Sequence, residues 1–166
     1  RVIEHAVALA TQKGIPVVVD PKYRNFFSYR GATVFKPNRR ELEAALGATL
    51  DLEHPEALPG LIDRLGVESI LLTLSERGMT LIEKGTSAEG VHRIPTTARE
   101  VYDVVGAGDT VTAYLAAMLA SGATPLEASV VANFAAGVEV GKLGAATVEP
   151  AEVLAAYDLH ASTQIS

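Results

Sequence analysis

The feature that most constrains the fold is a short, uninterrupted apolar run near the start of the chain. Residues 15–19 read Ile-Pro-Val-Val-Val and lead into Asp20. A strand with one face in water alternates apolar and polar residues, whereas an unbroken β-branched run is typical of a strand buried on both faces, as in a parallel sheet. Similar short runs occur at residues 33–35 and 69–74. The sequence therefore predicts a sheet sandwiched between helices.

Helical patterns and turn residues separate these runs. Strand, helix, strand, helix, strand, hairpin and then helices form an α/β pattern, which favours a three-layer α/β/α sandwich with function at the carboxyl ends of the strands. Beyond the helices we expect a polar, frayed tail at residues 158–166. Helices are expected at residues 1–13, 39–46, 107–120, 124–142 and 150–157, and a further one ends at Gly66. The expected hairpin pairs residues 79–82 with 91–94 around Lys84-Gly85.

Composition narrows the classes of function. The hydrophobic fraction of 48% and charged fraction of 20% are those of an ordinary soluble globular protein. The net charge is −6 and no cluster of Lys and Arg could neutralise a row of phosphates, so nucleic-acid binding is disfavoured. The chain has no cysteine, which excludes disulfides and thiolate metal sites. No run of about 18 apolar residues is present, so we expect a cytoplasmic protein without a membrane partner.

The beginning of the chain suggests a longer protein. It starts at Arg1, without Met, and a helical apolar pattern is already present at Val2, Ile3, Ala6 and Val7. We expect this chain to be a fragment that lacks N-terminal sequence.

The stretch Asp103–Thr110 is the first candidate site. Gly106 and Gly108 leave the backbone nearly bare, and a predicted helix follows at once. The first amides of a helix have no intrahelical acceptor and carry the positive end of its dipole, so a phosphate could bind there beside Asp109. The alternative is a tight turn that simply precedes a helix, with Asp109 as a first-turn carboxylate. The stretch alone leaves both interpretations open.

Asn38 and Glu41 also have two interpretations. An Asn three residues before a Glu at a helix start is typical of a capping box, in which each side chain accepts a hydrogen bond from the other residue's backbone N–H. Alternatively, Glu41 helps to hold Mg²⁺, directly or through water, while Asn38 contacts phosphate. Mg²⁺ suits that role because it keeps several waters and needs only one or two carboxylates.

Further polar residues follow the other predicted strands. Thr73-Leu74-Ser75-Glu76-Arg77-Gly78 could be the turn of a strand pair or a close approach for a nucleotide. Lys22, after the first strand, could be a solvated end or a point charge for phosphate. The four histidines show no metal-binding spacing, and no Gly-x-x-x-x-Gly-Lys-Ser/Thr loop is present, which disfavours a P-loop enzyme.

Taken in order, these motifs resemble a known family. Asn-x-x-Glu at 38–41, Thr-x-Ser-x-x-Gly at 73–78, Gly106-Ala107-Gly108-Asp109 preceded by Asp103, and residues 132–137 resemble the ribokinase-like sugar kinases, the phosphofructokinase B family. Within it, several segments resemble the heptose-phosphate kinase domain, which in many bacteria is fused to an adenylyltransferase; these segments are residues 19–22, 29–33, 75–79, 98–103 and 140–144. The resemblance covers residues 1–157 and corresponds to the C-terminal half of such a domain.

The resemblance implies a role for each motif. Asp109 is the base that takes the proton of the sugar hydroxyl, and the amides of Gly106, Ala107 and Gly108 form an anion hole. Asn38 and Glu41 serve the phosphate and Mg²⁺ region, and Asp103 belongs to a loop that in relatives often holds a monovalent cation such as K⁺. Thr73, Ser75, Gly78 and Asn133 lie near the nucleotide, and we add Lys22 and Glu76 as candidate contacts.

The resemblance also implies a reaction. We expect ATP-dependent phosphorylation of D-glycero-β-D-manno-heptose 7-phosphate at its anomeric hydroxyl, in a homo-oligomeric intact protein that could carry an adenylyltransferase. The alternatives are another sugar kinase of the family, such as a ribokinase or fructokinase, and a non-catalytic nucleotide-binding domain. Because the family's sugar-binding residues and lid lie in the N-terminal half, we expect no kinase activity from this chain alone. One departure is Val105, where relatives usually have Thr or Ser; it removes a hydroxyl but leaves the backbone donors.

Overall fold

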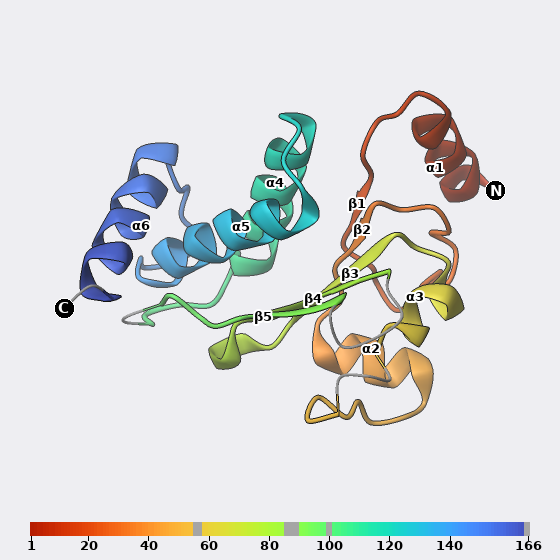
Figure 1. The fold of residues 1–166 in the computed structure, drawn as a ribbon, viewed down its shortest axis with the longest axis horizontal. Coiled ribbons are helices and arrows are strands. Elements are labelled where there is room, and N and C mark those ends of the chain that lie inside the picture. Colours follow the sequence, from red (N-terminus) through yellow and green to blue (C-terminus); the bar gives the residue numbers. More distant parts are fainter. Residues whose placement is uncertain (55–57, 85–89, 99–100, 165–166) are drawn as a thin grey trace. The chain divides into compact units, whose positions relative to one another are not determined.

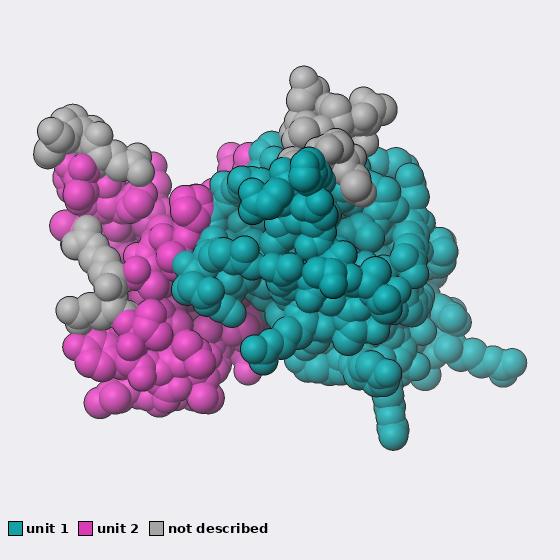
Figure 2. Space-filling view, turned by 90° about the horizontal axis from the view of Figure 1, so that it is seen from below, with its two compact units in different colours: residues 1–94 teal, residues 95–166 magenta. Residues whose placement is uncertain are grey.

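The chain forms two compact units. The computed structural model describes residues 1–54, 58–84, 90–98 and 101–164, and it divides the chain into unit 1, residues 1–94, and unit 2, residues 95–166 (Figures 1 and 2). Unit 1 contains the sheet. The elements of unit 1 are helices α1 (Val2–Gln12), α2 (Arg39–Leu46) and α3 (Gly60–Leu65) and strands β1 (Val18–Val19), β2 (Val34–Phe35), β3 (Ser69–Thr73), β4 (Met79–Glu83) and β5 (Val91–Ile94).

The sheet is mixed. Where the structure describes the chain, the sheet has five strands in the order β1-β2-β3-β4-β5, with β1, β2 and β3 parallel and β4 and β5 antiparallel to their neighbours. The prediction of buried parallel strands is thus confirmed for the first three, and the predicted hairpin is confirmed as the pairing of β4 with β5. Gly85, in the expected turn of that hairpin, lies outside the described residues. Since β1, β2 and β3 are parallel, their carboxyl ends share one edge of the sheet.

The first strand is shorter than the apolar run predicts. We expected it to begin at Ile15, but β1 contains only Val18 and Val19. The amide of Ile15 donates to the carbonyl of Ala10 at the end of α1, and Pro16 has no amide hydrogen to donate. The residues before Val17 therefore have no donor left for a ladder, and regular pairing starts later.

Helices α2 and α3 cover one face of the sheet. Leu42 of α2 and Ile62 of α3 are buried in one cluster with Phe35, Ile70 and Leu72 of the strands. Both helices end where predicted, at glycines with left-handed backbone, φ 67° at Gly47 and 71° at Gly66. Only glycine adopts that conformation without a steric penalty. This packing fixes the end of β2, where α2 begins.

The described part of unit 2, residues 95–98 and 101–164, contains three helices. They are α4 (Ala107–Ala120), α5 (Pro125–Val140) and α6 (Pro150–Gln164), and α4 packs along α5 (Figure 1). The prediction of α4 is confirmed over its whole length. Helix α5 stops two residues before the expected Lys142, because the chain turns at Gly141 and the amide of Lys142 donates to the carbonyl of Glu139.

The last helix is longer than predicted. We expected it to end at Tyr157 and a frayed tail to follow, but α6 continues to Gln164, and only residues 165–166 lie outside the described part. The rings of Tyr157 and His160 both contact the ring of Phe134 on α5. The hydroxyls of Ser162 and Thr163 donate to carbonyls of the preceding helical turn. The polar residues are thus accommodated within the helix. The polar composition of this segment therefore did not indicate the end of the helix.

Among the residues that the structure describes, none forms a helix with both the length and the apolar character needed to cross a membrane.

Candidate active site

In unit 1, predicted site residues meet at the carboxyl edge of the sheet. Asn38 follows β2, Thr73 ends β3, and the two form an isolated parallel bridge in which the amide of Thr73 donates to the carbonyl of Pro37 at 3.1 Å. Helix α2 begins directly after Asn38. The structure therefore brings the Asn-x-x-Glu motif and the start of the Thr-x-Ser-x-x-Gly motif side by side.

Asn38 and Glu41 form a complete capping box. The Asn38 side chain accepts a hydrogen bond from the Glu41 amide at 2.8 Å, and Oε2 of Glu41 accepts one from the Asn38 amide, also at 2.8 Å. The capping interpretation is confirmed. The box uses one carboxylate oxygen of Glu41, so its geometry does not exclude the metal interpretation, which needs only one oxygen.

The segment from Thr73 to Gly78 is the turn between β3 and β4. Residues 75–77 form a 3₁₀ helix, and the amide of Leu74 donates to the carbonyl of Gly78 at 2.8 Å. Ser75 has a left-handed φ of 56°, uncommon for a residue with a side chain, and Ser75 and Glu76 are exposed. The turn interpretation is confirmed, and its unusual backbone carries the exposed polar side chains of Ser75 and Glu76.

A residue that the sequence analysis missed lies at the same edge. Lys36 follows β2 and its side chain is only 5% exposed, with its ammonium 3.3 Å from Oδ1 of Asp20. The exposed Lys22 contacts Oδ2 of the same carboxylate at 3.0 Å. A buried ammonium needs such a partner, since burying an unpaired charge is costly. In the sequence, the position of Lys36 between a predicted strand and Pro37 could have indicated that it lies at this edge of the sheet.

Removing the charge of Asp20 should destabilise unit 1. For Asp20→Asn, we expect urea denaturation to show a loss of about 1–3 kcal/mol in the free energy of unfolding, because the buried Lys36 loses its carboxylate. Lys22→Met is the matched control, since it removes only the exposed partner and should change stability by less than about 1 kcal/mol. Equal effects of the two substitutions would contradict the assignment of Asp20 to Lys36.

In unit 2, the predicted anion hole forms the start of α4. Gly106 is the N-cap residue with φ 95°, and its carbonyl accepts hydrogen bonds from the amides of Asp109 and Thr110 at 2.8 and 2.9 Å. The amides of Ala107 and Gly108 come earlier in the helix, where no intrahelical acceptor exists. Asp109 is exposed in the first turn. The turn therefore offers backbone donors and an accessible carboxylate next to each other.

Asp103 shapes the approach to this turn. Its Oδ1 accepts a hydrogen bond from the Val105 amide at 2.9 Å, a local turn typical of Asp. The backbone amides of Tyr102 and Asp103 donate to the carbonyl of Val140 at 2.7 and 3.3 Å, so α5 holds the segment in place. A monovalent cation at Asp103 would have to share a carboxylate that already accepts one backbone hydrogen bond.

Asn133 contacts the protein backbone. It is 4% exposed on α5, and its Nδ2 donates to the carbonyl of Pro95 at 2.9 Å. Thr97 donates through Oγ1 to the carbonyl of Asn133 at 3.2 Å. A Cβ on Gly137, one turn further, would come within 2.7 Å of the same Thr97 Oγ1. These contacts make Asn133 a residue that positions the segment leading to Asp103.

Two other features of the described chain bear on ligand binding. An open pocket of unit 2 is lined by one face of α5 together with Tyr102, Ala156 and Leu159, and it contains none of the predicted site residues. Among the described residues, no group of three or more His, Asp and Glu side chains is placed to hold a metal ion.

Comparisons with known proteins agree with these motifs. The family model described as pfkB family carbohydrate kinase matches residues 1–152. Two relatives named bifunctional protein HldE are similar to the chain: that of Pelobacter propionicus is 50% identical over 95% of this chain and 32% of its own length, and that of Gluconacetobacter diazotrophicus is 51% identical over 93% and 32%. The chain thus spans about a third of the length of these curated relatives.

Solved structures share the fold. The crystal structure of ribokinase from Thermotoga maritima superposes with a TM-score of 0.75 at 26% identity, over 94% of this chain and 53% of the other. The Arabidopsis thaliana ribokinase complexed with ribose and ATP gives a TM-score of 0.78 at 24% identity, over 93% and 51%. The expected ribokinase-like α/β fold, with this chain matching about half of it, is confirmed, and the chain belongs to the pfkB family of carbohydrate kinases.

Proposed function

We propose that the chain is the nucleotide-binding and catalytic part of a sugar kinase that transfers the γ-phosphoryl group of ATP to a sugar hydroxyl. The observation that carries the proposal is the start of α4, where the bare turn at Gly106 is followed by the exposed carboxylate of Asp109. Phosphoryl transfer needs alignment and charge stabilisation more than covalent help from the protein, and backbone donors beside a base supply both.

The proposed roles of unit 2 follow from this turn. Asp109 accepts the proton of the attacking hydroxyl, which an ordinary carboxylate can do when proton transfer is late in the reaction. The amides of Gly106, Ala107 and Gly108 stabilise the charge on the transferred group. Asn133 lies near the nucleotide and acts there through the segment that begins at Pro95, whose carbonyl accepts a hydrogen bond from its side chain. Asp103 would hold K⁺ if a monovalent cation is used.

The proposed roles of unit 1 concern ATP. Asn38, with Lys22, contacts phosphate, while Thr73, Ser75, Glu76 and Gly78 contact the nucleotide. Glu41 would hold Mg²⁺ through the carboxylate oxygen outside the capping box, directly or through water. Bound Mg²⁺ neutralises phosphate charge during transfer. A single carboxylate suffices for this, because the phosphates and waters complete the coordination shell.

The proposed sugar substrate is D-glycero-β-D-manno-heptose 7-phosphate, phosphorylated at the anomeric hydroxyl in the cytoplasm as a step toward lipopolysaccharide. Residues 1–157 resemble the heptose-phosphate kinase domain, and relatives about half identical are named as bifunctional proteins, which supports fusion to an adenylyltransferase in the intact protein. We further propose that the intact protein is a homo-oligomer. A ribokinase or fructokinase is the second candidate, since solved ribokinases share the fold.

The test is a substrate comparison with the intact protein. ADP release should be measured with ATP and Mg²⁺ in the presence of heptose 7-phosphate, ribose or fructose in turn. The proposal expects the largest kcat/KM with heptose 7-phosphate. Preference for an unphosphorylated sugar would favour the second candidate, and no turnover with any sugar despite nucleotide binding would favour a non-catalytic nucleotide-binding domain.

Glu41 provides a separate prediction. In Glu41→Ala, we expect the Mg²⁺ concentration needed for half-maximal turnover to rise by about 10–100-fold, while the lost cap lowers the free energy of unfolding by only about 0.5–2 kcal/mol. Glu127→Ala is the matched control, because Thr124 and Glu127 form the same capping box at the start of α5. A normal Mg²⁺ response in Glu41→Ala would leave Glu41 with the capping role alone.

A further inference from the structure

Glu139 is a buried carboxylate that no proposed step uses. It lies near the end of α5 and is 2% exposed. Its Oε2 has no hydrogen-bond partner within the described part of the chain. Burying an acceptor without a donor is costly, and burying a negative charge without a partner is more so. Such a group calls for a functional explanation.

The carboxylate lies directly behind the phosphate-binding turn. A Cβ added to Gly106 would overlap Oε1 of Glu139, and the same Cβ would meet Ala145 at 3.6 Å. Gly106 is the N-cap residue of α4. The neighbouring carbonyl of Val140 accepts the amides of Tyr102 and Asp103, so the chain leading to the turn is fixed against this part of α5. Glu139 therefore contacts the backbone that carries the proposed anion hole.

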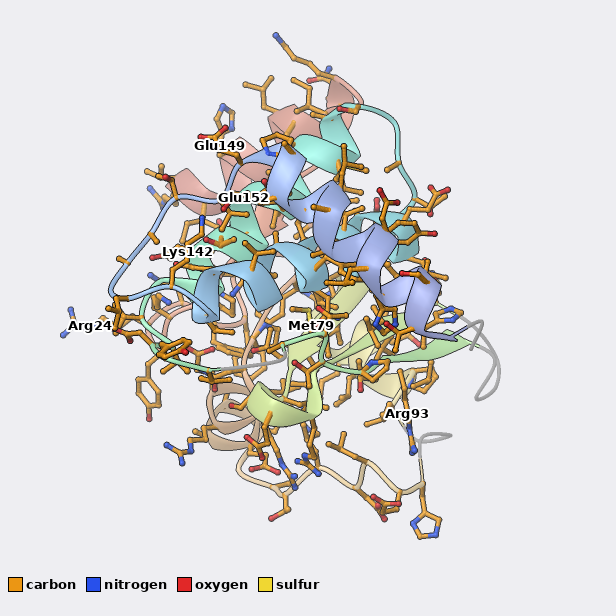
Figure 3. All side chains as sticks on the ribbon, turned by 90° about the vertical axis from the view of Figure 1, so that its left-hand side faces the viewer. Arg24, Met79, Arg93, Lys142, Glu149 and Glu152 are labelled. Atoms are coloured by element: carbon orange, nitrogen blue, oxygen red, sulfur yellow. The ribbon has the colours of Figure 1, made fainter. Side chains whose placement is uncertain are left out.

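No side-chain cation of unit 2 neutralises Glu139 within the described residues. Lys142 is the one Lys or Arg among residues 95–98 and 101–164, and it follows Glu139 by only three positions in the sequence. Its ammonium instead contacts Oε2 of Glu152 and the carbonyl of Thr147, both at 2.8 Å. Figure 3 shows Lys142 beside Glu152, at the point where α5 leads into α6.

We propose that Glu139 is a positioning residue of the phosphate-binding turn, and that its negative charge weakens the hold of this turn on phosphate groups. The inference rests on the proposed function of α4. The packing of the carboxylate against Gly106 fixes the turn, while its charge opposes the positive end of the α4 dipole that attracts an anion. The turn thereby stabilises the charge that develops on the transferred group without binding phosphate groups too tightly.

The test is a series of ligands with increasing charge. Dissociation constants for adenosine, ADP and ATP should be measured with the intact protein and with Glu139→Gln, which keeps the shape and removes the charge. We expect ADP and ATP to bind about threefold to tenfold more tightly to the variant, with adenosine unchanged. Glu149→Gln, which removes the same charge from an exposed site of the same unit, should leave all three constants within about twofold.

The ligand-charge pattern separates this role from a merely structural one, since a loosened fold would weaken all three ligands alike. Unchanged or weaker binding of ADP to Glu139→Gln would overturn the inference. Weaker binding in particular is expected if Glu139 instead recruits a cation that helps to bind phosphate. If Glu139→Gln does not fold, Glu139→Met keeps a neutral chain of similar length and should give the same pattern. Failure of the unaltered protein to bind ADP or ATP would instead overturn the proposed function.

Discussion

Asp109→Asn should lower the kcat of the intact protein by about 10²- to 10⁴-fold, the usual contribution of a general base. The amide has nearly the shape of the carboxylate but cannot accept the proton of the sugar hydroxyl. Because Asp109 is exposed in the first turn of α4, its substitution leaves the packing of the helix intact. We therefore expect KM for ATP and the midpoint of thermal unfolding to change little.

The measurement is steady-state ADP release with saturating ATP, Mg²⁺ and heptose 7-phosphate. Asp158→Asn is the control, since Asp158 is also an exposed aspartate of unit 2 but lies on α6. It should retain the unaltered rate. Turnover of Asp109→Asn near the unaltered rate would remove Asp109 as the base, even if the protein remains a kinase.

The local signals of the sequence were the reliable ones. The capping box of Asn38 and Glu41 and the glycines that end α2 and α3 were read correctly, because each depends on hydrogen bonds and backbone conformations within a few residues. The carboxyl edge of the sheet was predictable for a different reason. Short buried runs end at polar residues, and parallel strands bring those ends together.

Features that depend on distant contacts could not be read from the sequence. The length of α6 depends on the packing of Tyr157 and His160 against Phe134, more than twenty positions earlier. The buried Lys36 looks like any lysine until Asp20 is placed beside it, and Glu139 looks like an ordinary helix-surface acid until Gly106 lies against it. In each case local propensity was overridden by a tertiary contact.

Gly106→Ala tests the turn itself. The alanine would have to adopt a φ of 95°, and its Cβ would collide with the buried Glu139. We expect the two effects together to lower the free energy of unfolding by about 2–4 kcal/mol. Either the Glu139 carboxylate or the turn must shift to relieve the collision. Because Glu139 is buried and has little room to move, we expect the turn to shift, so that its amides no longer face the phosphate and kcat falls by about 10²- to 10³-fold.

The matched control lies at the other end of the same helix. Gly122 also has a left-handed φ, of 91°, but a Cβ there would meet nothing within 4 Å. Gly122→Ala therefore carries the conformational penalty without the collision and should reduce stability by only about 1–2 kcal/mol, with kcat unaffected. Equal destabilisation in the two variants, measured by urea denaturation, would show that Glu139 does not constrain Gly106.

A double-mutant cycle separates the effect of the collision from that of the glycine conformation. Glu139→Ala removes the carboxylate that the new Cβ would meet, so Gly106→Ala combined with Glu139→Ala should be less destabilised than the sum of the single changes by about 0.5–3 kcal/mol, the range of coupling between residues in contact. If kcat recovers along with stability, the collision was what displaced the amides. If stability recovers but kcat does not, the glycine conformation at residue 106 is itself what the anion hole requires, because only that backbone turns successive amides toward one point.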